Sequence, residues 1–228
     1  MIRPDAIPRF SPAIEPFVPD ILTLTSLPLF PLQTVLFPGG LLPLRVFEVR
    51  YLDMVRRCHE AGAPFGVVAL KQGSEVRRAG APLESFHAVG TLATIQNMDG
   101  AHPGLLLIEC HGEQRFQVTG TERLRNGLWV ADVRRIDEDL RVPIPSDLAH
   151  VERALAQVSE SLRVRQAESM PRTTTPSPPR NDCGWLANRW CELLPIPLEL
   201  KQRLMQLDNP LVRLELVSDI LQRTGILG

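Results

Sequence analysis

Lysine is almost absent from this 228-residue chain. Lys71 and Lys201 are its two lysines, and arginine supplies the rest of the 25 basic residues. A buried lysine can lose its proton and act as a base, whereas an arginine stays charged. No phosphate-binding loop of the form G-x-x-x-x-G-K-[ST] is present, since neither lysine follows a glycine. The composition therefore excludes a P-loop nucleotide hydrolase and disfavours lysine-based catalysis.

Excess charge and aromatic side chains are also scarce. The net charge is −1, aromatic residues make up 5%, and there is a single tyrosine. Nucleic-acid-binding surfaces combine a basic excess with aromatic platforms. The sequence feature most similar to such a surface is a group of scattered arginines at positions 123, 125, 134 and 135. RNA binding is kept as the alternative function, and the composition disfavours it.

The cysteines are few and form no C-x-x-C pair. They are Cys58, Cys110, Cys183 and Cys191. Such spacing favours reduced thiols in a cytoplasmic protein. Cys58-His59 and Cys110-His111 suggest zinc, but adjacent residues on a strand point to opposite faces and cannot easily reach one metal. We predict neither a metal nor a cofactor.

Uninterrupted hydrophobic runs are missing as well. Prolines at 4, 8, 12, 16 and 19 make residues 1–20 an extended arm rather than a signal peptide. The apolar region 21–47 contains prolines at 28, 31, 38 and 43, which argue against a membrane-spanning helix. We expect a cytoplasmic protein that does not insert into membranes.

Residues 21–140 show the pattern of a β-rich domain with one inserted helix. The period changes after residue 47 to a helical stripe, which ends near Gly62. Strands are then predicted around 64–70, 89–98, 104–112, 115–120 and 128–136, with a hairpin turn at Asp99-Gly100. Many short strands and little helix favour a closed or nearly closed barrel.

Residues 141–228 read as helical. A narrow seam of Leu148, Val151, Leu155, Val158 and Leu162 predicts a long helix, with Ser146 as a candidate N-cap. The Pro-rich segment 170–180 cannot continue it. Asp182, Pro197 and Asn209-Pro210 then introduce three more helices. The predicted fold class is α+β, a barrel followed by an all-α bundle.

Several motifs, in order, resemble the N-terminal substrate-binding domain of Lon proteases. They are LPLFPLQTVLFPGGLLPLRVFEVRYLDMVRRCHEAGAPFGVV, VGTLATI, GEQRF and the C-terminal WCELLPIPLELKQRLMQLDNPLVRLELVSDIL. The resemblance covers about residues 26–222. It implies a PUA-like pseudobarrel followed by a helical bundle, and the recognition of protein or peptide segments.

The chain departs from the longer members of that family. Those members continue into an ATPase and a serine–lysine peptidase, whereas this sequence ends at Gly228. Ser74 follows Lys71 closely, and a surface turn accounts for that pair better than a catalytic dyad does. We therefore expect a noncatalytic, stand-alone member that is peptidase S16-like by resemblance alone.

Partners follow from this expectation. They are protein or peptide segments. If the protein is an adaptor, a separate protease or another complex is a further partner. The sequence leaves self-association open. The helical seam together with Trp185 and Trp190 offers contact surfaces, although packing within the bundle explains these residues better. We expect the binding groove between the barrel and the first long helix, apolar with a few arginines.

The R-V-F-E-V-R-Y segment contributes most of the candidate site residues. Phe47 and Tyr51 lie four apart, so a helix beginning near Phe47 would pack both under the barrel. Glu48 would face the positive helix start. Arg45 would pair with Glu48 or bond to strand carbonyls, and Arg50 would do so on the other side. This predicts a structural corner or a peptide-binding one, and Glu48 lacks the partners of a general base.

Arg115 and Phe116 of GEQRF complete the candidate set. An arginine and a phenylalanine after a glycine in a strand connection suggest a corner that orders the sheet. Peptide binding by Arg115 is the alternative. No catalytic residue is predicted.

Overall fold

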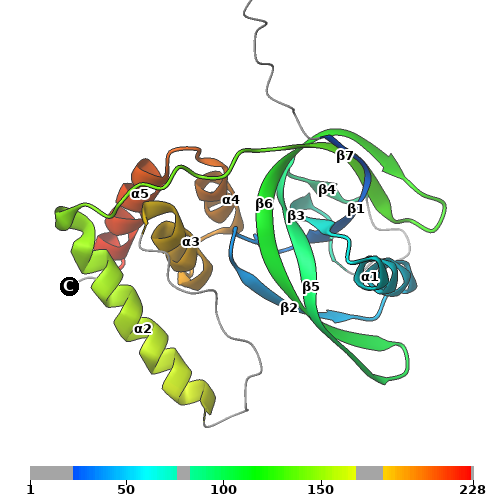
Figure 1. The fold of residues 1–228 in the computed structure, drawn as a ribbon, viewed down its shortest axis with the longest axis horizontal. Helices are drawn as coiled ribbons and strands as arrows, with labels where there is room; N and C mark the ends of the chain where they lie inside the picture. The colour runs from blue at the N-terminus through cyan, green and yellow to red at the C-terminus, as the bar shows by residue number, and fades with distance from the viewer. Residues whose placement is uncertain (1–22, 76–82, 168–181, 227–228) are drawn as a thin grey trace, which may run out of the picture.

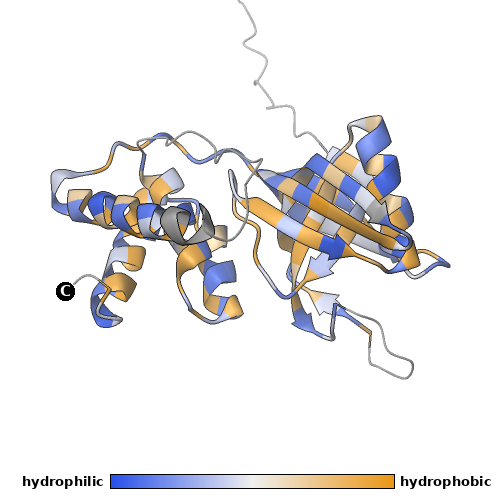
Figure 2. Cartoon of the chain, turned by 90° about the horizontal axis from the view of Figure 1, so that it is seen from below, coloured by the Kyte–Doolittle hydropathy of each residue, from blue (hydrophilic) through white to orange (hydrophobic). Residues whose placement is uncertain are grey.

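A computed structural model describes residues 23–75, 83–167 and 182–226 of the chain. It has a β-rich part, on the right in Figure 1, and a helical part on the left. Figure 2 shows the same two parts after a 90° turn, with hydrophobic and hydrophilic residues alternating along the strands. The predicted arm at 1–20 and Pro-rich loop at 170–180 lie outside the described residues.

Seven strands form the β-rich part. They are β1 (Thr23–Leu32), β2 (Leu41–Val46), β3 (Phe65–Gln72), β4 (Ser85–Phe86), β5 (Val89–His102), β6 (Leu105–Arg123) and β7 (Trp129–Arg135). The sheet order is β1-β7-β6-β5-β3-β4, with β2 beside β6. A parallel pairing of β1 with β3 closes the ring, and every other pairing is antiparallel. Closure satisfies backbone groups that an open edge would expose, and it confirms the predicted barrel.

Two details of the strand prediction are wrong. Asp99 and Gly100 lie inside β5, which continues to His102, so the hairpin turn falls at positions 103 and 104. The segments 104–112 and 115–120 belong to one strand, β6, which pairs with β2, β5 and β7. The long strand is interrupted by register shifts rather than by a turn, which a sequence pattern does not distinguish.

Helix α1 (Val49–Ala61) covers one side of the barrel. Its buried face includes Leu52, Val55 and Cys58, spaced at helical intervals. Gly62 ends it in the left-handed conformation, with φ of 59°. A residue with a side chain would be strained there, so Gly62 is the stop that the sequence predicts.

The helical part follows β7. It contains a 3₁₀ turn η1 (Ser146–Leu148), α2 (Ala149–Ala167), α3 (Cys183–Leu193), α4 (Leu198–Gln206) and α5 (Pro210–Arg223). Asp182 caps α3 by accepting from the Trp185 amide at 2.7 Å, and Asn209 caps α5, as predicted. Ser146 is not the cap of α2, because it opens the 3₁₀ turn before that helix.

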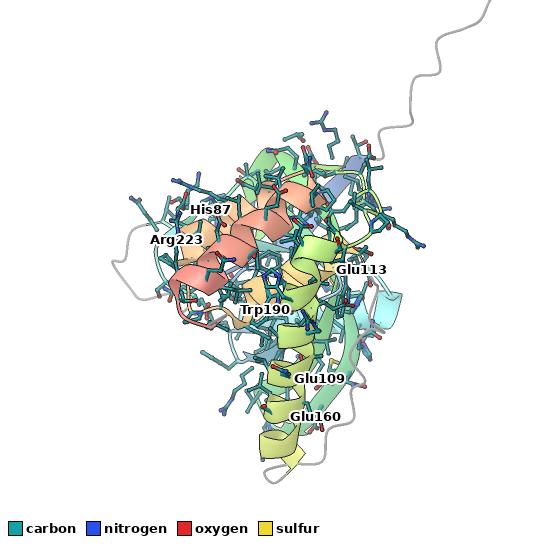
Figure 3. All side chains as sticks on the ribbon, turned by 90° about the vertical axis from the view of Figure 1, so that its left-hand side faces the viewer. His87, Glu109, Glu113, Glu160, Trp190 and Arg223 are labelled. Carbon is teal, nitrogen blue, oxygen red and sulfur yellow. The ribbon has the colours of Figure 1, made fainter. Side chains whose placement is uncertain are left out.

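The hydrophobic core has three clusters, and the cluster of the helical part also includes Val35, Phe37 and Ala69 from the β-rich part. Leu148, Val151 and Leu155 of the predicted seam are buried in the helical core. Trp190 lies in the same core beside α2, and its indole nitrogen donates to the Val151 carbonyl at 3.1 Å (Figure 3). This part of the seam packs within the molecule. Among the described residues, no helix combines the length and apolar character needed to cross a membrane.

Candidate functional site

The corner between β2 and α1 is built differently from the prediction. Helix α1 begins at Val49, two residues later than expected, with Glu48 as its N-cap residue. Phe47 therefore stays outside the helix and is 52% exposed, whereas Tyr51 is buried. The expectation that both rings pack under the barrel is wrong for Phe47. Tyr51 stacks on Phe30 with ring centroids 4.0 Å apart.

The buried Arg50 side chain holds this corner through three hydrogen bonds. Its Nε donates to Glu48 at 3.1 Å, its Nη1 to the Gly127 carbonyl at 2.9 Å, and its Nη2 to Glu84 at 3.3 Å. Burial lowers the pKa of Arg50, but Tyr51 and the two carboxylates outweigh it and raise that pKa overall. The buried Arg50 guanidinium uses all three of its nitrogens as donors. It therefore connects α1 to the β6–β7 turn and to the segment before β4.

Glu48 does not cap the helix with its side chain, because its carboxylate is engaged by Arg50. Arg45 is exposed on β2, directly across from Leu107 of β6. Within the described part of the chain, Arg45 forms neither the expected ion pair with Glu48 nor a bond to a strand carbonyl. The corner is therefore braced by Arg50 rather than by Arg45.

The outer side of the corner is apolar. Phe47 is 52% exposed, Val49 73% and Leu107 39%. We call these three residues the corner patch. Phe47 and Val49 lie two residues apart along the chain, and Leu107 pairs with Arg45, two residues before Phe47. A rigid support beneath exposed apolar side chains is suited to binding, because little conformational entropy is lost on contact.

Arg115 lies at the junction between the barrel and the helices. It is 4% exposed and donates to the Met205 carbonyl at 3.0 Å and to Asp139 at 3.1 Å. Its neighbour Phe116 points into the barrel, where Gly66 and Gly90 leave room for the ring. The two residues of GEQRF thus serve different parts of the molecule, since adjacent strand residues face opposite sides.

Sequence reasoning missed a second arginine at this junction, which shares Asp139 with Arg115. Arg213 of α5 is 1% exposed; it bonds to Asp139 through two nitrogens and to Asn188 of α3 at 3.1 Å. We call Arg115, Asp139 and Arg213 the junction clamp. A signal was present, because Arg213 interrupts the apolar face of α5 at helical spacing from Val217.

A second contact joins the Pro38-Gly39 turn to α3. Arg189 donates to the Gly39 carbonyl and, at 3.0 Å, to the Pro38 carbonyl. Glu192 orients the same guanidinium at 2.6 Å. A Cβ at Gly40 would collide with the Glu192 carboxylate, so the turn can approach the helix closely because it has a glycine there. Burial raises the pKa of Glu192 to about 7, although Arg189 and Lys201 oppose the shift.

A cleft of about 580 Å³ lies between the two parts. We call it the interlobe cleft. Barrel residues of β5, β6 and β7 form one wall, and residues 137–141 with the first turns of α3 form the other. This cleft differs from the predicted groove in two ways: no residue of α2 is among its lining residues, and charged residues are prominent in the lining. Glu113, Arg135, Asp137, Glu138 and Trp185 are among these lining residues.

The four cysteines are not activated as nucleophiles. All four cysteines are free and buried, and burial raises the pKa of Cys110 and of Cys191 to about 12. A thiol with such a pKa is a poor nucleophile. Over residues 23–75, 83–167 and 182–226, no three His, Cys, Asp or Glu side chains gather closely enough to hold a metal.

The barrel followed by helices defines a mixed α+β domain of the kind that the sequence predicts. Residues 26–223 match the family described as "ATP-dependent protease La (LON) substrate-binding domain". Because the match covers most of the chain, the protein belongs to this family. A substrate-binding role is therefore its general function.

Solved structures agree with this assignment. The crystal structure of a Lon N-terminal domain protein from Xanthomonas campestris is 32% identical, with a TM-score of 0.62. The similarity covers 86% of this chain and 98% of that one. The N-terminal domain of Mycobacterium avium complex Lon protease is 16% identical with a TM-score of 0.57, over 85% of this chain and 96% of that one, and shares the fold.

A curated relative extends well beyond the matched region. Lon protease from Anaeromyxobacter dehalogenans (strain 2CP-C) is 24% identical over an alignment of 203 residues that covers 86% of this chain. The match spans 23% of that protein's length.

Proposed function

We propose that the protein binds exposed apolar segments of other proteins and does not cleave them. The observation that carries this proposal is the corner patch, in which Phe47 and Val49 are exposed on a corner held by buried Arg50. The family's substrate-binding role supports it. Apolar contact on a small rigid surface gives weak binding that tolerates many sequences.

The test uses the full chain and a permanently unfolded, alkylated, dye-labelled model protein, without nucleotide. Phe47→Ala should weaken binding roughly fivefold or more, as expected when an aromatic contact residue is truncated. Leu216→Ala is the matched control, because Leu216 is also exposed, at 41%, but lies on α5. Fluorescence anisotropy measures both affinities.

Two results would contradict the proposal. One is that Phe47→Ala and Leu216→Ala bind the unfolded protein as tightly as the parent chain. The other is cleavage of the unfolded protein by a homogeneous sample. If instead a gel shift showed salt-dependent binding of total RNA and no protein binding, the RNA-binding alternative would replace it.

An adaptor role is the narrower form of the proposal. The protein would pass a bound segment to a separate protease or another complex. Leu155, a residue of the predicted seam, is 5% exposed and so is not available to a partner. An adaptor contact would use other surfaces of the helical part, where Val212 and Leu216 are exposed.

A further inference from the structure

Arg45 is a charged residue that lies directly beside the corner patch. It is paired with Leu107 in the antiparallel register of β2 with β6. Side chains at such paired positions share one face of the sheet, with Cβ atoms about 4.5–5.5 Å apart. Phe47, the aromatic residue of the patch, follows two positions after Arg45 and is 52% exposed. A guanidinium therefore borders the apolar surface that is proposed to bind protein segments.

The charge of Arg45 is not used by the folded chain. Arg45 is exposed, and over the described residues no carboxylate forms an ion pair with it. Glu48, the acidic residue nearest to it in the sequence, is bound by Arg50 at 3.1 Å. By contrast, the buried residues Arg50, Arg115 and Arg213 each bind a carboxylate of the chain. The Arg45 guanidinium is therefore available to a bound segment.

Two carboxylates on the same face restrict where a negative group of that segment can lie. Asp99 of β5 pairs with Leu107 on the side away from Arg45, so a row of three side chains runs from positive to negative across β2, β6 and β5. Glu109, diagonal to Arg45, accepts from Asn97 at 2.7 Å. A negative group of a ligand is attracted at the β2 end of this row and repelled at the β5 end.

We infer that the corner patch selects apolar segments that carry an aspartate or glutamate two positions from an apolar residue. Residues two apart in an extended segment point to the same side. The apolar side chain then lies on Phe47 and Leu107, while the carboxylate accepts from Arg45, whose guanidinium suits bidentate pairing with a carboxylate. The inference rests on the proposed function and names the class of segment that this function recognises.

The test uses the full chain and three short labelled peptides. Each repeats leucine, serine, X and serine, with glutamate, glutamine or lysine at X, so that leucine and X share one side of the extended peptide. The glutamate peptide should bind roughly two- to fivefold more tightly than the glutamine peptide, the upper range for an exposed ion pair. It should also bind more tightly than the lysine peptide. Fluorescence anisotropy measures the three affinities.

Nonspecific attraction would give a different order. The net charge of the chain is −1, so its overall field does not favour an acidic peptide over a basic one. A preference for glutamate must therefore come from a local positive group. Equal affinity for the three peptides, or tighter binding of the lysine peptide, would overturn the inference.

Arg45→Glu separates this contact from a general effect on the fold. The lysine peptide should then bind more tightly than the glutamate peptide, while the unchanged melting temperature shows that the chain stays folded. Arg45→Gln should make the glutamate and glutamine peptides bind equally. Arg153→Glu is the matched control, because Arg153 is an exposed arginine on α2, and it should keep the preference for glutamate. An unchanged order in Arg45→Glu, or the same reversal in the control, would contradict the inference.

Phe47→Ala distinguishes the inference from the proposed function. It should weaken all three peptides by a similar factor, because it removes apolar contact and leaves the Arg45 guanidinium in place. If the parent chain binds the unfolded model protein but shows no preference for glutamate, the inference fails and the proposed function stands. If the parent chain binds no unfolded protein, the proposed function fails and the inference fails with it.

Discussion

Glu192, whose side chain is 29% exposed, shows how a single partly buried carboxyl can make the junction sensitive to pH. Burial raises its pKa to about 7, while unfolded glutamates titrate near ~4.3. The folded chain therefore holds this proton more tightly than the unfolded chain does. It follows that the contribution of Glu192 to stability falls as the pH rises from about 4.3 to 7.

Glu192→Gln should remove this dependence, because glutamine stays neutral and its carbonyl can still accept from Arg189. Between pH 5 and pH 8, taken as roughly the ends of the titration, the melting temperature of the parent chain should fall relative to that of the variant. Thermal unfolding of both proteins across this range measures the difference. A gap that stays constant with pH would show that Glu192 titrates normally.

Arg50 and Arg45 show what residue-level reading can and cannot predict. A short segment with three charges among apolar residues predicts a braced corner, and the structure has one. Which arginine braces it depends on where α1 begins, and that start lies two residues beyond the expected position. The shift places Arg50 below the corner and leaves Phe47 outside. Local pattern does not fix such an offset, because Gly127 and Glu84, which bind Arg50, are distant in sequence.

Among the elements, α2 changes from buried to more exposed between Leu155 and Leu162. Leu155 is 5% exposed within the helical core, whereas Leu162, two turns further, is 36% exposed. Leu155→Ala should lower the free energy of unfolding by about 2–4 kcal/mol, the usual range for a buried leucine. Leu162→Ala should cost less, about 1 kcal/mol, since more than a third of its surface stays in contact with water. Denaturant unfolding compares them, and similar losses would contradict this packing.

Elements with local signals were predictable. Asp182, Asn209-Pro210 and Gly62 mark helix ends through their own backbone and side-chain chemistry, and each does so in the structure. The length of strand β6 was not predictable, because it depends on pairing with three other strands rather than on the strand's own sequence. The interlobe cleft was not predictable either, because its lining residues come from positions between 38 and 188 and meet only in the folded chain.

For the whole molecule, the junction clamp couples barrel to helices. Asp139 lies in the segment between β7 and η1 and accepts from Arg115 of β6 and Arg213 of α5. From α4, Gln202 donates to the Val89 carbonyl at 2.9 Å, and Glu199 lies 3.2 Å from the His87 ring nitrogen. The relative position of the two parts is therefore set by the junction clamp together with these polar contacts and with an apolar cluster that includes residues of both parts.

Asp139→Asn should leave two guanidiniums close together without their shared negative partner. A loss on the order of 3 kcal/mol is expected, as when one member of a buried ion pair is removed. Unfolding followed by near-ultraviolet circular dichroism and by calorimetry should then separate into two transitions. Asp137→Asn, at an exposed position two residues away, is the control and should unfold as the parent does. A single unshifted transition for Asp139→Asn would contradict the coupling.

Ring closure through β1 has a consequence for synthesis on the ribosome. The first strand pairs with β7 as well as with β3, and the Ser26 amide meets Asp132 across 106 positions of sequence. Such distant pairings make folding slow. Until the last strand emerges, Leu27, Leu29 and Phe30 have no complete barrel to enter. The nascent chain therefore exposes apolar surface of the kind that molecular chaperones shield from aggregation.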